Sequence, residues 1–281
     1  MFIIWGFSED EEIIQYAKKN NIPVYRMEDG FLRSKGLGAM HTPPFSLCLD
    51  KKGMYFDSTQ PSELEDILNT YDFRTDKDLL RQAQDCMKKL NQLGVSKYNH
   101  VKKKDISSIY GAKKRKRILV IGQVEDDASI LKGSEKKYTN NDLVRIAAKE
   151  NPDAEIIYKP HPDVLTGKRK KQSDPKEVRS IAKVIEEPLS LADAFQTIDH
   201  VYTITSLSGF EALIRGIPVT TIGAPFYSGW GLTDDRQFTQ RRNRTLTIEE
   251  LFAGAYILYP RYVDPVTGSE LTLEETIEKL I

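Results

Sequence analysis

Short apolar runs alternate with amphipathic stretches along most of the chain. Residues 2–5 and 24–27 are apolar-rich and predict two strands, and residues 9–20 between them predict a helix, which makes one β-α-β unit. Residues 43–57 indicate a hairpin around Lys52-Gly53. Residues 77–93 carry leucines, alanine and methionine at helical spacing, so a long amphipathic helix ending near Gly94 follows.

The second half of the chain repeats the alternation more regularly. Four short apolar runs predict buried strands, and the stretches between them predict helices. The predicted strands are 118–121, 154–158, 200–205 and 217–222, and the predicted helices are 141–149, 189–198 and 208–215. This order is typical of a doubly wound parallel sheet.

The stretch between residues 96 and 117 shifts to lysine, serine and tyrosine without clear periodicity, which predicts a linker between two lobes. With 281 residues the chain is long enough for two cores. We therefore place the first α/β lobe, with a helical linker, at residues 1–112 and the second at residues 113–281.

Charge and cysteine content narrow the function classes. Forty-one basic and forty-one acidic residues cancel, which argues against a general nucleic-acid partner. Cys48 and Cys86 are far apart and imply neither a disulfide framework nor a zinc site, which fits a cytoplasmic protein. No apolar run approaches the roughly 18 residues that span a bilayer, so we expect any membrane contact to be peripheral. The basic runs at 102–104 and 113–117 are solvated linker or could rest on an anionic membrane surface.

Three acids follow the strand at residues 118–121. Glu125, Asp126 and Asp127 lie in a loop that starts at Gly122, and the carboxyl ends of parallel strands are where open α/β sheets bind ligands. Crowded carboxylates are costly unless solvent, a cation or a polar ligand receives them. The loop is either a solvated acidic turn or part of a binding crevice.

A histidine between two prolines follows the next strand. Pro160 and Pro162 restrict the backbone on both sides of His161, and Lys159 precedes them. A histidine held in this way can donate to a phosphate or protonate a leaving oxygen, or it can merely cap local backbone groups.

Hydroxyl groups gather where the third strand of this lobe meets its helix. Ser206 and Ser208 precede Gly209, and helix-start amides attract anions, so this stretch could cradle a phosphate. Glu211 could accept the hydrogen bonds of a ribose diol. Alternatively, Ser208 is an ordinary N-cap with Glu211 as its capping-box partner.

The first lobe carries its own polar strand end. Glu28, Asp29 and Gly30 end the second strand, and Arg33 opens a glycine-punctuated loop that could approach an anion. The alternative is an acidic turn with Gly30 at positive φ. Tyr227 and Trp230 could stack on a ring or pack in the core.

Nucleotide-binding Walker and G-x-G-x-x-G loops are absent, as are H-E-x-x-H and G-x-S-x-G. Six motifs in order resemble instead the KpsC-type retaining β-Kdo glycosyltransferases of capsule polysaccharide biosynthesis, and the chain is most similar to their C-terminal module. The motifs are R-M-E-D-G-F-L-R-S from Arg26, S-K-Y-N from Ser96, G-Q-V-E-D-D-A-S from Gly122, K-P-H-P-D from Lys159, S-G-F-E-A-L from Ser208 and G-W-G-L-T from Gly229.

The resemblance implies a GT-B-like fold of two Rossmann-like lobes with an interlobe cleft, the first lobe binding the acceptor and the second CMP-Kdo. It implies transfer of Kdo from CMP-β-Kdo to a Kdo-terminated lysophosphatidylglycerol, with two displacements. Asp127 would be the nucleophile, with Asp126 as the fallback, and Asp29 the general base. Neither a cofactor nor a metal is expected. Contact with the inner membrane and with capsule assembly proteins is implied as well.

The remaining site residues are expected to bind substrate. His161 would meet the CMP phosphate, with Lys159, Ser206 and Ser208 sharing its charge, and Glu211 would hold the ribose. Further substrate-binding or CMP-binding positions carried over from the motifs are Glu28, Gly30, Arg33, Gln123, Asp126, Pro162 and Gly209.

Two other functions remain open at this point. A nucleotide-sugar epimerase or hydrolase would use the same architecture with carboxylates and a histidine. A non-catalytic module that binds a glycan or sugar nucleotide in a capsule export complex would need no acceptor.

Overall fold

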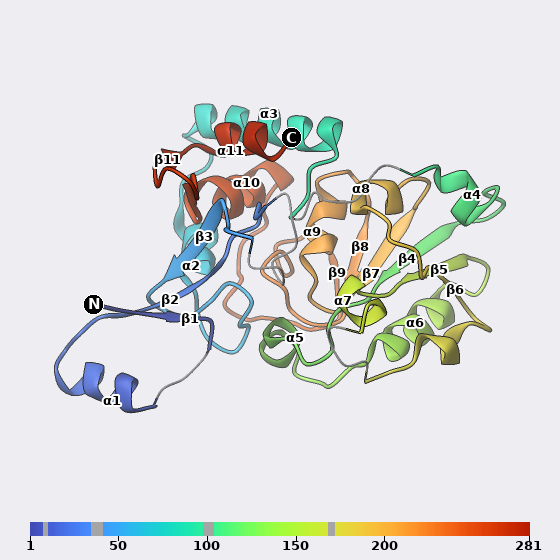
Figure 1. Ribbon diagram of the computed structural model, residues 1–281, viewed down its shortest axis with the longest axis horizontal. Coiled ribbons are helices and arrows are strands. Elements are labelled where there is room, and N and C mark those ends of the chain that lie inside the picture. Colours follow the sequence, from blue (N-terminus) through green and yellow to red (C-terminus); the bar gives the residue numbers. More distant parts are fainter. Residues whose placement is uncertain (8–10, 35–41, 98–103, 168–171) are drawn as a thin grey trace. The chain divides into compact units, whose positions relative to one another are not determined.

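The computed structural model describes residues 1–7, 11–34, 42–97, 104–167 and 172–281, and the chain divides into two compact units (Figure 1). The first comprises Met1–His100 and Leu246–Ile281, and the second comprises Val101–Thr245. Each unit has its own sheet, five-stranded in the first and six-stranded in the second. The predicted α/β class is confirmed.

The second unit contains a fully parallel sheet in the order β6-β5-β4-β7-β8-β9. Numbered within the unit, this is the order 3-2-1-4-5-6 of dinucleotide-binding folds, which reverses its winding direction between the first and fourth strands. The strands are β4 (Arg117–Ile121), β5 (Glu155–Lys159), β6 (Lys183–Val184), β7 (His200–Thr203), β8 (Val219–Thr221) and β9 (Asp234–Asp235). The reversal therefore lies between β4 and β7.

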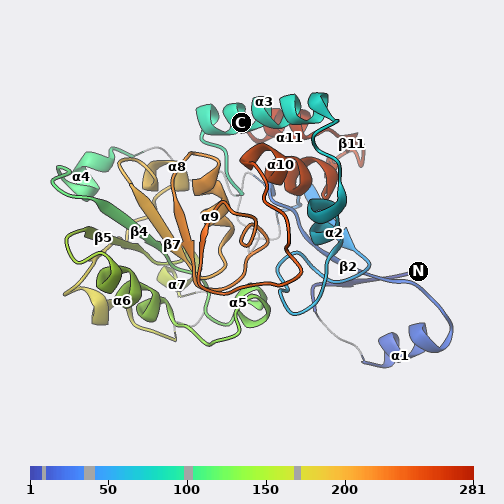
Figure 2. The same ribbon diagram turned by 180° about the vertical axis from the view of Figure 1, so that it is seen from behind.

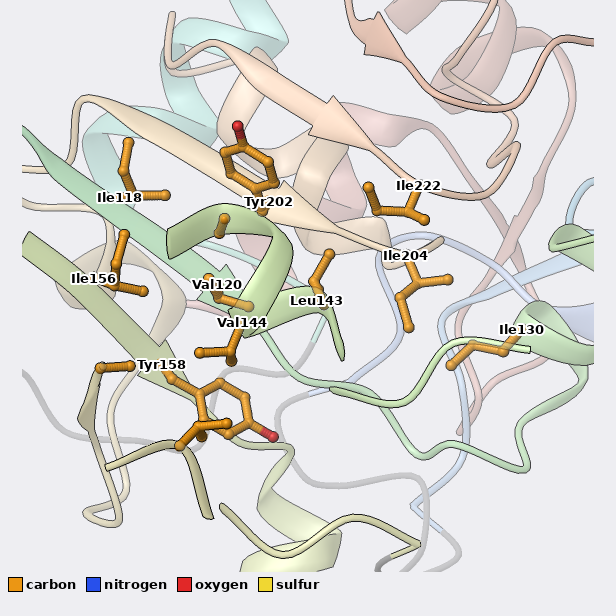
Figure 3. Close-up of a cluster of buried hydrophobic side chains, with 13 residues drawn as sticks. Ile118, Val120, Ile130, Leu143, Val144, Ile156, Tyr158, Tyr202, Ile204 and Ile222 are labelled. Atoms are coloured by element: carbon orange, nitrogen blue, oxygen red, sulfur yellow. The ribbon is translucent and has the colours of Figure 1, made fainter. Parts of the chain in front are cut away.

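Helices cover both faces of this sheet (Figure 2). The helix α6 (Asn140–Glu150) is fixed at its start by a capping box between Thr139 and Asp142 and lies on one face. The other helical elements are α4 (Ile106–Tyr110), α5 (Ala128–Gly133), α7 (Pro162–Leu165), η2 (Pro175–Val178), α8 (Leu191–Ala194) and α9 (Leu207–Leu213). The two-residue periodicity of β4 and β5 places Ile118, Val120 and Ile156 against Leu143 and Val144 of α6 (Figure 3).

The sheet of the first unit differs from the prediction. Its order is β1-β2-β3-β10-β11, and only β1 and β2 run parallel, so this unit is a mixed α/β structure and not a Rossmann-like one. The strands are β1 (Phe2–Trp5), β2 (Val24–Asp29), β3 (Ser46–Asp50), β10 (Arg261–Val263) and β11 (Glu270–Leu271). The predicted hairpin is wrong, because β3 pairs with β2 and β10 while residues 54–57 form a buried turn.

The long helix of the first unit agrees with its prediction. The helix α3 (Lys77–Leu93) begins at the N-cap Asp76 and ends at Gly94, whose φ of 67° is the left-handed conformation that glycine adopts at low cost. The other helices are α1 (Glu11–Lys19), α2 (Glu63–Thr70), α10 (Ile248–Phe252), the π-helical turn η3 (Ala253–Leu258) and α11 (Leu273–Leu280).

The predicted second lobe, residues 113–281, extends too far along the chain. Residues 246–281 belong to the first unit, because β10 pairs with β3 and Lys89 of α3 lies 2.7 Å from Glu278 of α11. Pairing between segments more than 200 residues apart leaves no local pattern. No helix of the described residues is long and apolar enough to span a membrane.

Arg117, the first residue of β4, is a buried cation that joins four segments of the second unit. Its Nε donates to Glu155 at 2.6 Å, Nη1 donates to Thr197 at 2.8 Å and Nη2 donates to the Gly111 carbonyl at 2.8 Å. The side chain is 1% exposed. A buried charge is tolerated only when it is paired and hydrogen-bonded, so this arginine fixes the start of the central strand.

We expect Arg117→Leu to lower the free energy of unfolding of the second unit by about 2–4 kcal/mol, since it leaves buried acceptors without their donor. Urea unfolding measures this loss. The matched control is Arg115→Leu, two residues earlier and exposed, which should change stability by less than about 0.5 kcal/mol. Equal effects of the two substitutions would contradict the anchoring role.

Candidate active site

The loop after β4 lies against the loop after β5. The Gly122 amide donates to the Lys159 carbonyl at 2.9 Å. A Cβ at Gly122 would lie 3.0 Å from Pro160 Cα and 3.2 Å from the His161 nitrogen, closer than such atoms ordinarily approach. Glycine at this position therefore lets the acidic loop and the histidine-proline loop meet at the carboxyl edge of the sheet.

Gln123 connects the same loop to the strand on its other side. Its Oε1 accepts from the Thr205 amide at 2.8 Å, and its Nε2 donates to Thr205 Oγ1 at 3.1 Å. The residue is 6% exposed. The Gln123 side chain therefore joins the ends of β4 and β7 where the winding direction reverses, and the substrate contact predicted for Gln123 stays a prediction.

The three acids of the β4 loop occupy three different environments. Glu125 is buried and accepts from the amides of Asn140, Gln172 and Ser173, so it holds the loop in place. The Asp126 side chain is exposed. Asp127 is half-buried and is the N-cap of α5, where Oδ1 accepts from both the amide and the hydroxyl of Ser129, at 2.9 and 2.7 Å. Among the described residues, both hydrogen bonds that the Asp127 side chain accepts fall on Oδ1.

His161 is held in one tautomer by the backbone amide of Asp163, two residues later. Its Nδ1 accepts from the Asp163 amide at 3.2 Å, as the N-cap of α7, with Pro162 at the first helical position. Because Nδ1 is an acceptor, the neutral ring carries its proton on Nε2. Nδ1 thus caps the helix while Nε2 carries a proton that it can donate, and the side chain is 34% exposed.

Lys159, the last residue of β5, is a buried ammonium. It is 9% exposed, and no side chain among the described residues lies within ion-pairing distance of it. Burial lowers the pKa of Lys159 to about 8. An uncompensated cation at the carboxyl edge of a parallel sheet destabilises the empty protein and favours an anionic ligand.

The serine-rich stretch after β7 begins helix α9, but its N-cap is Ser206 and not Ser208. Ser206 Oγ accepts from the Ser208 amide at 3.2 Å, so the alternative with Ser208 as N-cap is wrong. Gly209 is needed because a Cβ there would overlap the Tyr227 hydroxyl and lie 2.8 Å from its Cζ. Glu211 is buried, and its Oε2 lies 4.0 Å from Arg215 Nη1.

The two aromatic residues that could have stacked on a ligand belong to the core. Tyr227 and Trp230 are each 0% exposed. Tyr227 donates to the Ser206 carbonyl at 2.5 Å, and Trp230 donates to the Phe226 carbonyl at 2.8 Å. Tyr227 therefore supports the turn before α9, and Trp230 closes the turn of its own loop.

In the first unit, Arg33 turns back onto Asp29. Arg33 Nε lies 2.6 Å from Asp29 Oδ2, and Nη1 donates to the Thr42 carbonyl at 2.6 Å. The Arg33 guanidinium orients the carboxylate of Asp29, whose buried Oδ1 accepts no hydrogen bond from the described residues, and the predicted contact of Arg33 with substrate stays a prediction. The glycine-rich loop at 35–41 and the motif residues 98–99 lie outside the described residues.

Gly30 is constrained by contact rather than by a special φ. It is not among the positive-φ residues, so the alternative of a positive-φ turn is wrong. A Cβ there would lie 2.6 Å from Ser46 Cβ and 3.0 Å from its carbonyl carbon. Glu28 accepts from the Asp29 amide at 3.0 Å and so helps to shape the end of β2.

The sequence motifs included two further residues without assigning them a role. Thr205 and Ser129 bond to the polar groups of Gln123 and Asp127, and only Ser129 has a local sequence signal, the spacing Q-x-x-x-D-x-S. Among the residues that the structure describes, no group of three or more histidine, cysteine or acidic side chains could hold a metal ion.

The sequence of this chain is similar to those of known capsule and lipopolysaccharide proteins. A family model described as "Capsule polysaccharide biosynthesis protein" matches residues 2–262. The chain belongs to this family. The lipopolysaccharide-processing protein LpsZ of Rhizobium meliloti is 50% identical over 279 residues, and the capsule polysaccharide modification protein LipA of Neisseria meningitidis serogroup B is 43% identical over 279 residues.

The match covers 99% of this chain but only 63% of LpsZ and 39% of LipA. The chain thus spans less than two thirds of the length of these curated family members. Two solved structures are similar over 99% of the chain, each at 38% identity. They are a Thermosulfurimonas dismutans KpsC β-Kdo 2,4 transferase, with a TM-score of 0.89 and 86% of that chain covered, and a β-Kdo 2,7 transferase, with a TM-score of 0.80 and 83% covered.

The buried ammonium predicts a stability that depends on pH. Between about pH 8 and 10.5 the folded Lys159 has released a proton that the unfolded chain still holds, so its contribution to the unfolding free energy rises with pH. The interval between the two pKa values corresponds to about 3 kcal/mol.

We therefore expect Lys159→Met to raise the unfolding free energy at pH 7 by up to about 3 kcal/mol, and this gain to vanish near pH 10.5. Urea unfolding at several pH values measures the difference. Lys149→Met, on the exposed end of α6, is the control and should show no such pH-dependent gain. A destabilised Lys159→Met at pH 7 would contradict the account.

Proposed function

We propose that this chain is a glycosyltransferase module that transfers Kdo from CMP-β-Kdo to a Kdo-terminated glycolipid acceptor with retention of configuration. The family and the similarity to two Kdo transferases support this reaction class. The observation that carries the proposal is the buried Lys159 ammonium, for which the described part of the chain supplies no counter-ion, one strand away from the carboxylate of Asp127. A donor with an anionic leaving group needs both a cation and a nucleophile.

In the proposed first step, Asp127 attacks the anomeric carbon of the donor. A bond forms between Oδ2 and that carbon, the bond to the phosphate oxygen breaks, and CMP leaves with the electron pair. The developing phosphate charge is met by the Lys159 ammonium and the Nε2 proton of His161. Ser206 and Ser208 contribute hydroxyls to the same site, and Glu211 is assigned to the ribose.

In the proposed second step, the acceptor hydroxyl displaces the enzyme. Its oxygen attacks the same carbon, its proton passes to Asp29, and the Asp127 carboxylate is released with the electron pair. Two displacements return the original configuration. The ion pair with Arg33 holds Asp29 in a fixed orientation, with Oδ1 turned away from the guanidinium.

The covalent route predicts a trapped sugar. With CMP-Kdo and a Kdo-terminated lipid analogue, Asp29→Asn should slow the second step by about 10²–10⁴-fold and accumulate a Kdo-sized adduct seen by intact-protein mass. Adding Asp127→Ala should abolish the adduct. Asp153→Asn, an exposed acid, is the control for the substitution and should turn over normally.

Peptide mapping decides between neighbouring acids. An adduct on Asp126 would contradict the assignment of Asp127. CMP release at the same rate with and without acceptor would favour a hydrolase, and unchanged glycan elongation by Asp127→Ala would favour a non-catalytic binding module.

The affinity for CMP should fall as Lys159 loses its proton. Above pH 7 the CMP phosphate keeps one charge state, since its second pKa is about 6, so weakening above about pH 8 reports the lysine. Calorimetric titration should show about tenfold to a hundredfold weaker binding in Lys159→Met at pH 7. Lys159→Arg keeps its charge and should bind equally at pH 7 and 10. The same pH profile in wild type and Lys159→Met would contradict the contact.

A further inference from the structure

The Thr205 backbone amide determines which way the side-chain amide of Gln123 faces. The Thr205 amide can only donate, so the atom of Gln123 that faces it at 2.8 Å must be the oxygen Oε1. The NH2 group of Gln123 therefore faces the other way, toward Thr205 Oγ1 at 3.1 Å and Ser129 Oγ at 3.5 Å.

This direction continues through Ser129. Because the amide nitrogen of Gln123 is a donor only, the Ser129 hydroxyl cannot give its proton to Gln123. The proton points instead to Asp127 Oδ1, 2.7 Å away. The Ser129 amide donates to the same oxygen at 2.9 Å. Two donors thus converge on Oδ1: the Ser129 amide, which can only donate, and the Ser129 hydroxyl, whose direction follows from the Gln123 amide and therefore from Thr205.

We propose that Ser129 and Gln123 are positioning residues that select which oxygen of Asp127 attacks the sugar. Oδ1 is held by two donors and its lone pairs are less available, so Oδ2 is the nucleophilic atom and the carboxylate keeps one rotamer. This inference rests on the proposed function of Asp127. It assigns Gln123 to the geometry of the nucleophile and not to the substrate.

A merely structural role for Ser129 makes a different prediction. The helix cap between Asp127 and the Ser129 amide survives when the hydroxyl is removed, so the stability of Ser129→Ala should stay near that of the wild type. What the hydroxyl adds is the direction of the attacking oxygen. Its loss should therefore appear in the rate of adduct formation and not in melting temperature or CMP affinity.

Single-turnover formation of the Kdo adduct, quenched in acid and followed by intact-protein mass, tests the inference with CMP-Kdo as the donor. All variants carry Asp29→Asn so that the adduct persists. We expect Ser129→Ala to form it about tenfold or more slowly, with unchanged CMP affinity. Ser129→Thr keeps the hydroxyl and should recover most of the rate. Ser134→Ala, at the other end of α5, is the matched control and should react at the wild-type rate.

Gln123→Glu replaces the donating NH2 group with an accepting carboxylate oxygen and leaves the side-chain size almost unchanged. The introduced carboxylate oxygen accepts the Ser129 proton, which is then lost to Asp127, so this variant should be as slow as Ser129→Ala. The double variant should be little slower than either single one, because both remove the same donor. If Gln123→Glu is unstable, the comparison of Ser129→Ala with Ser129→Thr alone decides.

The two failures are distinguishable. Wild-type adduct formation by both Ser129→Ala and Gln123→Glu, with Asp127→Ala inactive, would overturn the positioning inference and leave the proposed function intact. Adduct formation in Asp127→Ala would overturn the proposed function itself.

Discussion

The second unit depends on the bond between Gln123 and the backbone of Thr205. In a doubly wound sheet the strands on either side of the reversal point lead their connections to opposite faces, which opens a crevice at their carboxyl ends. Gln123 spans that point with both ends of its amide, so the loops after β4 and β7 keep a fixed separation. Gly122 fastens the first of these loops to the histidine-proline loop on the other side. Asp127, His161 and Ser206 are consequently displayed from three adjacent strand ends.

The Lys159 ammonium lies at the same edge of the sheet, and its burial costs folding free energy. Two other buried charges of the unit are compensated: Arg117 pairs with Glu155, and Glu125 accepts from three amides. Lys159 differs, because burial lowers its pKa and no described side chain offsets its charge. Proteins tolerate such a cost mainly where a ligand removes it. Arg117 therefore stabilises the fold, whereas the Lys159 charge destabilises it unless, as proposed, an anionic ligand binds there.

The sequence was most informative where burial is complete. The predicted strands at residues 118–121 and 154–158 correspond to β4 (Arg117–Ile121) and β5 (Glu155–Lys159), whose apolar side chains are buried as in a sheet covered on both faces. Residues 54–57 misled for the same reason: Met54 and Phe56 are buried, but Asp50 accepts from the amides of Lys52 and Gly53 and so turns the chain. A short apolar run does not distinguish a strand from a buried turn. The return of residues 246–281 to the first unit depends on strand pairing at long range, which no local pattern carries.

The candidate site shows a similar division. The residue types located the strand ends, because glycine, proline and acids after apolar runs mark such ends. They did not reveal which polar groups already have partners inside the protein. Gln123 and Arg33 were predicted to contact substrate, and the structure shows that Gln123 bonds to Thr205 and Arg33 pairs with Asp29. Hydrogen-bond partners are set by tertiary proximity, so only the structure separates residues that touch a ligand from those that position them.

In the proposed function, the carboxyl edge of the second sheet binds the donor nucleotide through Lys159 and His161. A crystal structure of the protein with bound CMP is the decisive measurement. We expect phosphate oxygens within hydrogen-bonding distance of Lys159 Nζ and His161 Nε2, with Asp127 Oδ1 still bonded to Ser129. A CMP phosphate bound away from both side chains would contradict the proposed binding mode.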